Sequence, residues 1–260
     1  MRAKDEIFMP NIGSYEERLK DFHWSIAEKE LEYKPGDVIN IGWYCSDRIC
    51  NQGMGGKDAL LWENSLGEEK RYTYDDIRLC SNGLGAYLHR LGIREGDRVC
   101  LFMDRIPELY IGLLGILKIG AVAQPLFSAF GDESLYVRLE NAGTRAILTQ
   151  RKHAAKVRKI IDRLPGLQHI IIVDHDENKD LKEREVAYFM ERERTENLDI
   201  FPTTAESPSL LHYTSGTTGM PKGVQHVHYS LISQYLTAKW VLDLTAEDIY
   251  WCTADPGWVT

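Results

Sequence analysis

Residues 214–223 carry a dense set of phosphate-binding groups, in the sequence Thr-Ser-Gly-Thr-Thr-Gly-Met-Pro-Lys-Gly. The glycines permit positive φ angles and leave backbone N–H groups unhindered. Four hydroxyl groups lie within five positions, and Lys222 adds a positive charge. Amides, hydroxyls and an ammonium together suit the oxygens of a polyphosphate. The residues that we expect to contact nucleotide phosphates are Thr214, Ser215, Gly216, Thr217, Thr218, Gly219 and Lys222.

The same composition has a second interpretation. Ser, Thr, Gly and Pro all form turns, so the segment is also typical of an ordinary connection between two strands. The strand predicted over 209–213 and the position of Lys222, three residues after Gly219, favour the phosphate loop. The segment does not fit the GxxxxGK[ST] spacing of a Walker A loop, which disfavours a P-loop hydrolase.

From residue 74 onward, the elements that must position this loop alternate between helix and strand. The periodicity predicts helices over 75–91, from 107, over 132–141 and over 152–164, and strands over 98–103, 121–124, 145–149 and 169–173. Such alternation predicts parallel strands joined by helical crossovers. We therefore predict an α/β fold, with parallel sheets flanked by helices.

Residues 1–73 are predicted to form an N-terminal helical segment with short strands. The pattern indicates an amphipathic helix over 14–32 capped by Ser14, a second helix over 39–49, and strands over 59–63 and 71–73. The highly charged stretch 174–199 predicts a solvated helix with an irregular loop.

Composition excludes several classes of protein. With 43% apolar residues the chain can form a core, which excludes disorder. A net charge of -8 has the wrong sign for a protein that neutralises nucleic-acid phosphates. The apolar run 109–117 is far shorter than the ~20 residues of a membrane span. Five scattered cysteines are typical of reduced thiols, so we expect a cytoplasmic protein. Its oligomeric state cannot be inferred from one sequence.

His226 and His228 stand two residues apart, a spacing that would let them share one face of a strand and ligate a metal ion. No acidic or thiol ligand lies nearby in the sequence. We therefore favour packed histidines and predict no metal site.

Three segments of the chain resemble a known family. LLHYTSGTTGMPKGVQHVH resembles the phosphate-binding signature of the acyl-adenylate-forming superfamily. PELYIGLLGILKIGAVAQPLFSAF and KWVLDLTAEDIYWCTADPGWVT are similar to AMP-forming acetyl-CoA synthetases in their shorter bacterial form. The resemblance covers about residues 21–260. It implies an enzyme that uses ATP, Mg²⁺ and coenzyme A to activate acetate through an acyl-adenylate.

The resemblance also implies roles for residues outside the loop. Trp258, Val259 and Thr260 would lie near the acyl group, whereas Trp251 is interpreted as a core aromatic. Arg158 is a candidate for a CoA phosphate contact, and a solvated helix face is the alternative. The first reaction step needs no general base, because a carboxylic acid with a pKa of ~4–5 is already ionised at neutral pH.

Members of this family continue well beyond the length of this chain. By resemblance, residues 74–260 would be an incomplete part of the large domain, without the C-terminal domain. We expect such a chain to be inactive alone, with a strand edge or apolar face exposed. The alternatives are a ligase for propionate or medium-chain acids, and a non-catalytic nucleotide-binding or interaction module.

Overall fold

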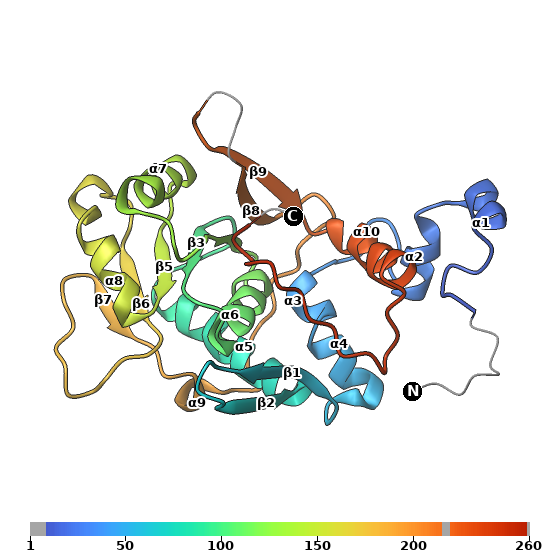
Figure 1. Cartoon of the computed structure of the whole chain (residues 1–260), viewed down its shortest axis with the longest axis horizontal. Helices are drawn as coiled ribbons and strands as arrows, with labels where there is room; N and C mark the ends of the chain where they lie inside the picture. The colour runs from blue at the N-terminus through green and yellow to red at the C-terminus, as the bar shows by residue number, and fades with distance from the viewer. Residues whose placement is uncertain (1–8, 215–218, 259–260) are drawn as a thin grey trace. The chain divides into compact units, whose positions relative to one another are not determined.

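The computed structural model describes residues 9–214 and 219–258, which divide between two compact units (Figure 1). Unit 1 combines the chain up to Asp37 with Tyr229–Thr253, and unit 2 combines Val38–His228 with the residues from Ala254 onward. Unit 2 contains the candidate phosphate loop, residues 214–223, and residues 254–260, which are called the acyl segment below. The boundary predicted after residue 73 divides the sequence differently and stays a prediction.

A mixed sheet forms the centre of unit 2, and its order among the described residues is β7-β6-β5-β3-β4-β8-β9. Its strands are β3 (Arg98–Phe102), β4 (Val122–Pro125), β5 (Ala146–Thr149), β6 (His169–Ile172), β7 (Glu185–Ala187), β8 (Pro208–Thr214) and β9 (Lys222–Val227). Neighbouring strands are parallel except β8 and β9, which are antiparallel. The predicted α/β fold is confirmed. Strand β9, which the sequence analysis did not predict, forms one edge of the sheet.

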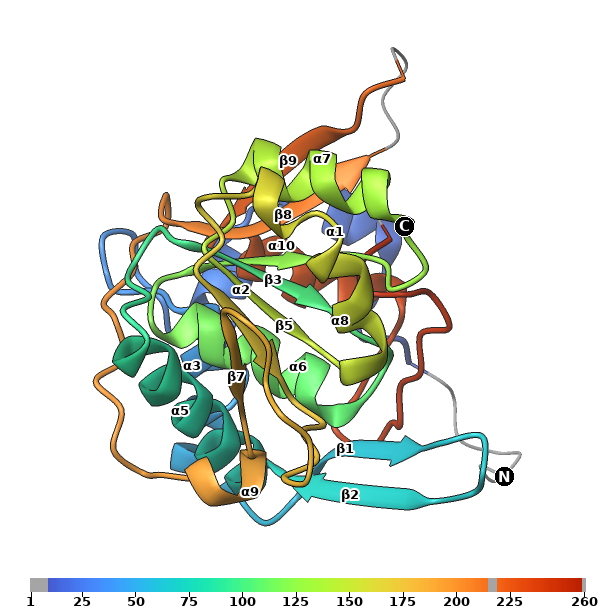
Figure 2. The ribbon, with the colours of Figure 1, turned by 90° about the vertical axis from the view of Figure 1, so that its left-hand side faces the viewer.

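Helices cover both faces of this sheet (Figure 2). Helices α5 (Tyr74–Arg90) and α6 (Pro107–Lys118) pack on one face, and α7 (Asp132–Ala142) and α8 (Arg151–Arg158) on the other. Successive side chains of β3 therefore enter different cores: Leu101 packs with α5 and α6, and Phe102 with α7 and α8. Burial on both faces explains why the parallel strands are continuous apolar runs.

Local signals in the sequence set the ends of these helices. Thr73 and Asp76 form a reciprocal capping box at the start of α5, and Pro107 occupies the first turn of α6. Helix α7 ends at Gly143, whose φ of 58° is left-handed and satisfies the last carbonyl groups. Such caps explain why helix positions from residue 74 onward were predictable.

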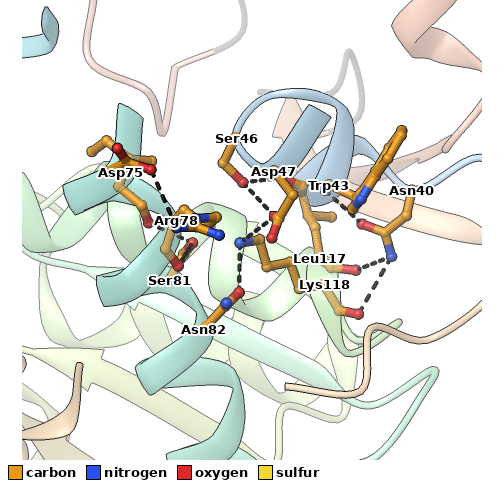
Figure 3. A network of polar contacts seen from close by, with 12 residues as sticks. Asn40, Trp43, Ser46, Asp47, Asp75, Arg78, Ser81, Asn82, Leu117 and Lys118 are labelled. Carbon is orange, nitrogen blue, oxygen red and sulfur yellow. Dashed lines mark hydrogen bonds and ion pairs between the residues drawn. The ribbon is translucent and has the colours of Figure 1, made fainter. Parts of the chain in front are cut away.

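Two predicted helices of unit 2 are interrupted. The one predicted over 39–49 is divided into α3 (Ile41–Tyr44) and α4 (Asp47–Ile49), followed by a π-helical turn over Cys50–Met54. The side chain of Asn40 accepts a hydrogen bond from the Trp43 N–H and donates to the carbonyl of Leu117, so α3 is docked on the end of α6 (Figure 3). The helix predicted over 152–164 ends at Arg158, and a 3₁₀ turn follows over Ile161–Arg163.

The charged stretch contains a strand that the sequence analysis missed and only a short helix where it predicted a solvated helix with an irregular loop. Strand β7 and the short helix α9 (Met190–Glu193) both lie within it. Outside the large sheet, β1 (Asp58–Glu63) and β2 (Glu69–Thr73) form an antiparallel hairpin close to the predicted positions. No helix in the described ranges is both long and apolar enough to cross a bilayer.

Unit 1 contains α1 (Tyr15–Asp21), α2 (Ser25–Glu30), α10 (Ser230–Leu236) and a π-helical turn over Thr237–Val241. Ser14 caps α1 as predicted, but the single helix predicted over 14–32 is wrong. Phe22 adopts an extended conformation that ends α1, and its ring packs edge-on against Trp24 and Trp240. The core interpretation of Trp251 is also wrong, because its side chain is 79% exposed.

Candidate functional site

The candidate phosphate loop connects β8 to β9, and the two strands hold its ends in register. Thr214 lies opposite Lys222, and Tyr213 lies opposite Gly223. Ser215, Gly216, Thr217 and Thr218 lie outside the described residues. The antiparallel strands on either side agree with a connection between two strands, and phosphate binding by this segment stays a prediction.

Strand alternation places the two ends of the loop on a common face of the hairpin. In an antiparallel pair, residues directly opposite each other share a face, and so do residues two positions apart on one strand. This face, called the loop face below, carries Leu210, His212, Thr214, Lys222, Val224 and His226. Contact between the imidazole rings of His212 and His226, with centroids 5.7 Å apart, agrees with this arrangement.

The opposite face of the hairpin is anchored on α7. Tyr213 is only 6% exposed, and its hydroxyl donates a 2.7 Å hydrogen bond to the side-chain oxygen of Asn141. The Arg138 guanidinium lies 5.9 Å from the centre of the same ring. Burial raises the pKa of Tyr213 to about 12, so the phenol stays a neutral donor at physiological pH. The residue that precedes Thr214 is thus rigidly held.

Lys222 is available for an anionic ligand. Its side chain is exposed and forms no ion pair within residues 9–214 and 219–258. Gly219, three residues earlier, has a φ of 83°. This left-handed conformation favours glycine at that position. An exposed ammonium that has no ion-pair partner among the described residues suits a phosphate group.

The candidate acyl segment contacts the loop face through a hydrogen bond. The Nε2 of His212 lies 3.2 Å from the carbonyl oxygen of Pro256. A tight turn follows, in which the N–H of Trp258 donates to the carbonyl of Asp255 at 2.8 Å. The Trp258 ring packs edge-on against Phe127, just after β4, with centroids 6.1 Å apart. Val259 and Thr260 lie outside the described residues.

The two histidines considered as metal ligands have different surroundings. His226 packs against His212, whereas His228 follows the end of β9 and is completely buried. The Nδ1 of His228 accepts a 3.0 Å hydrogen bond from the N–H of Ile41, and burial lowers the pKa of its imidazole to about 4. The described part of the chain contains no group of three or more His, Cys, Asp or Glu side chains able to hold a metal ion.

Arg158, the candidate CoA contact, forms an ion pair that the sequence did not predict. Its Nη2 lies 2.6 Å and its Nε 2.7 Å from Oε1 of Glu185 in β7. The side chain of Glu185 has no exposed surface. Arg158 therefore compensates a buried carboxylate at the end of α8.

His212 was not a candidate in the sequence analysis. The available signal was its position, two residues before Thr214 on a predicted strand, which places both side chains on the same face. Its hydrogen bond to a segment 44 residues away has no local signature.

A comparison with known protein families identifies the family of this chain. The profile of the AMP-binding enzyme family matches residues 47–260. The chain belongs to the AMP-binding enzyme family. Among curated relatives, the acetyl-coenzyme A synthetase of Bacillus subtilis is 42% identical over 251 residues, which is 96% of this chain and 43% of the relative. That of Deinococcus radiodurans is 32% identical and matches 92% of this chain and 40% of the relative.

Two solved structures share the fold of this chain. The acyl-CoA synthetase of Brucella canis superposes with a TM-score of 0.83 at 26% identity, over 94% of this chain and 43% of that one. The acetoacetyl-CoA synthetase of Streptomyces lividans superposes with a TM-score of 0.78 at 19% identity, over 90% of this chain and 41% of that one, and shows the fold alone. The chain thus spans less than half the length of the relatives it matches.

Proposed function

We propose that this chain is the N-terminal part of a longer AMP-forming acetate–CoA ligase. The reaction would convert ATP, acetate and CoA to acetyl-CoA, AMP and pyrophosphate through acetyl-adenylate. One observation carries the proposal: the exposed Lys222, which forms no ion pair with the described residues, lies opposite Thr214, and the turn bearing Trp258 docks on the same face. The names of the Bacillus and Deinococcus relatives support acetate as the acid.

The first step of this reaction requires positioning and charge compensation more than proton transfer. Acetate is ionised at neutral pH and attacks the α-phosphorus directly, with pyrophosphate leaving. Lys222 would offset negative charge on the phosphates, and the hydroxyls and amides of the loop would hold their oxygens. Trp258, Val259 and Thr260 would contact the acyl group beside this loop.

Mg²⁺ would enter this site with ATP, as part of the substrate. The ion usually binds through substrate phosphates and only one or two carboxylates. Thr214 supplies a hydroxyl at the mouth of the loop, and no acidic cluster is present around it among the described residues. These residues fit a metal held mainly by the phosphates of ATP.

For CoA binding, the candidate contact is Arg158. Arg158 would contact a CoA phosphate while keeping its pair with Glu185, in which Nε and Nη2 are engaged.

We also propose a cytoplasmic location, supported by the five cysteines, all of which are free thiols.

Acetate-dependent exchange of labelled pyrophosphate into ATP tests the proposal. We expect the full-length protein to catalyse exchange and Lys222→Ala to reduce it at least ~100-fold, as for other lost transition-state donors. We expect the 260-residue chain to bind ATP without exchange, and Lys222→Ala to weaken that binding. Exchange by the chain alone would disprove its predicted inactivity. ATP hydrolysis in the absence of any carboxylic acid would instead support the alternative of a hydrolase.

A panel of acids from formate to hexanoate tests the acyl specificity. One methylene group is worth about 1–3 kcal/mol in a pocket, so we expect weak activity with propionate. If kcat/KM for propionate or hexanoate equals or exceeds kcat/KM for acetate, acetate is not the preferred substrate.

A further inference from the structure

We propose that His212 is a positioning residue that fixes the acyl segment relative to the phosphate loop. The inference rests on the proposed function. His212 lies two residues before Thr214 on the loop face, and its Nε2 contacts the carbonyl oxygen of Pro256, two residues before Trp258. His212 is therefore close to Thr214 along the backbone and is joined to the segment that carries Trp258 by a hydrogen bond.

The His212 imidazole is a donor in this contact. A carbonyl oxygen only accepts, so Nε2 carries the hydrogen and the ring is oriented by the bond. Burial lowers the pKa of His212, and the neighbouring imidazole of His226 lowers it further, whereas the Pro256 carbonyl raises it. The net direction favours a neutral ring at pH 7, whose Nδ1 then carries no hydrogen.

Backbone packing fixes the rest of the acyl segment. The N–H of Gly257 donates a 2.8 Å hydrogen bond to the side chain of Asp255, which closes the turn. Gly257 is buried so closely that a Cβ would lie 2.2 Å from the N of Phe127 and 2.4 Å from the C of Leu126. The segment thus rests on the backbone after β4 on one side and on His212 on the other.

Trp258 itself is poorly enclosed in the described structure. Its side chain is 56% exposed, and Phe127 is the aromatic ring against which it packs. The position of the Trp258 ring is therefore set by the turn that carries it, and that turn is attached to His212. Because a misplacement of about 1 Å can cost ~100-fold in rate, a donor that fixes this turn would matter for alignment of the acid with the α-phosphate.

Fluorine NMR of the 260-residue chain labelled with 5-fluorotryptophan tests the positioning directly. Trp258→Phe assigns the resonance of Trp258. We expect His212→Leu to shift and broaden this resonance, and His212→Gln, which keeps an N–H donor, to restore most of it. His226→Gln is the matched control. His226 lies on the loop face and packs against the imidazole of His212, but the hydrogen bond to Pro256 comes from His212. An unchanged Trp258 resonance in His212→Leu overturns the proposal.

A second variant covers the case in which His212→Leu does not fold. Gly257→Ala displaces the same turn from the Phe127 side, and we expect it to move the Trp258 resonance while leaving a cooperative thermal transition. A folded Gly257→Ala protein with the wild-type resonance would equally overturn the proposal, because the turn would then not determine the position of Trp258.

Kinetics of the full-length protein connect this geometry to the reaction. We expect His212→Leu to lower kcat for acetate-dependent exchange at least 10-fold, with the KM for ATP within twofold, and His212→Gln to recover most of kcat. A change confined to the KM for ATP contradicts the positioning role. If the wild-type protein shows no exchange, the proposed function fails, whereas the fluorine spectra still decide whether His212 positions Trp258.

Discussion

The ammonium of Lys118 lies 2.6 Å from the carboxylate of Asp47, and the lysine side chain has no exposed surface. The same ammonium donates a 2.7 Å hydrogen bond to the side-chain oxygen of Asn82 (Figure 3). This cluster joins α4, α5 and α6 beneath the sheet. Burial lowers the pKa of Lys118, and the charge of Asp47 opposes that shift. A buried lysine is tolerated here because both an ion pair and an amide satisfy it.

Replacement of Lys118 by Met is expected to destabilise unit 2 strongly. Removing one partner of a buried ion pair leaves the other charge uncompensated, which typically costs about 3–5 kcal/mol. The free energy of unfolding, measured by urea denaturation, checks this expectation. The double variant Lys118→Met/Asp47→Leu removes both charges and should recover part of the loss. A double variant less stable than Lys118→Met would contradict the assignment.

Gly83→Ala distinguishes helix propensity from packing. In an exposed helix, this substitution stabilises by about 1 kcal/mol. In α5, however, a Cβ on Gly83 would lie 2.1 Å from the carbonyl oxygen of Glu193, a backbone atom of α9. We therefore expect a net destabilisation of about 1–3 kcal/mol, measured by the urea midpoint. Gly166→Ala is the control, since its Cβ would have no neighbour within 4 Å and should leave the midpoint almost unchanged.

The pH dependence of stability should contain a contribution from His228. Burial lowers its pKa from 6.5 to about 4, so the unfolded state binds more protons between these values. Stability contributed by the neutral ring is complete above pH 6.5 and is lost as the pH falls towards 4, by about 3 kcal/mol. Denaturation at several pH values should show a shallower acid slope for His228→Gln. Parallel slopes for the two proteins would argue against a buried, neutral His228.

Substitution of Arg158 separates structural stabilisation from CoA binding. Arg158→Ala leaves the fully buried Glu185 carboxylate unpaired, and we expect a loss of about 1–3 kcal/mol in unfolding free energy. Because Arg158 is also the proposed CoA contact, we expect Arg158→Ala to raise the KM for CoA in the full-length protein. Glu185→Gln is the matched variant, expected to lower stability without raising this KM. If both variants change the KM equally, Arg158 acts only through the fold.

Local patterns were sufficient where a helix or strand is set by its own sequence. The capping box of Thr73 and Asp76 and the left-handed Gly143 mark helix ends that need no distant partner. Patterns failed where packing overrode them. Phe22 leaves the helical stripe to pack against Trp240, and Glu185 enters the sheet because Arg158 compensates its charge. Strand β9 lies at one edge of the sheet among the described residues, and Val224 on it is 42% exposed.

The sequence by itself determined which donor groups and glycines the loop carries and the α/β class, because these groups and the hydrophobic period are properties of neighbouring residues. It also carried the family resemblance that the comparisons confirm. Only the tertiary structure decided that Thr214 and Lys222 share the face carrying His212, and that His212 reaches Pro256. Contacts across 44 residues, or across 27 for Arg158 and Glu185, depend on how elements pack, and no local pattern encodes them.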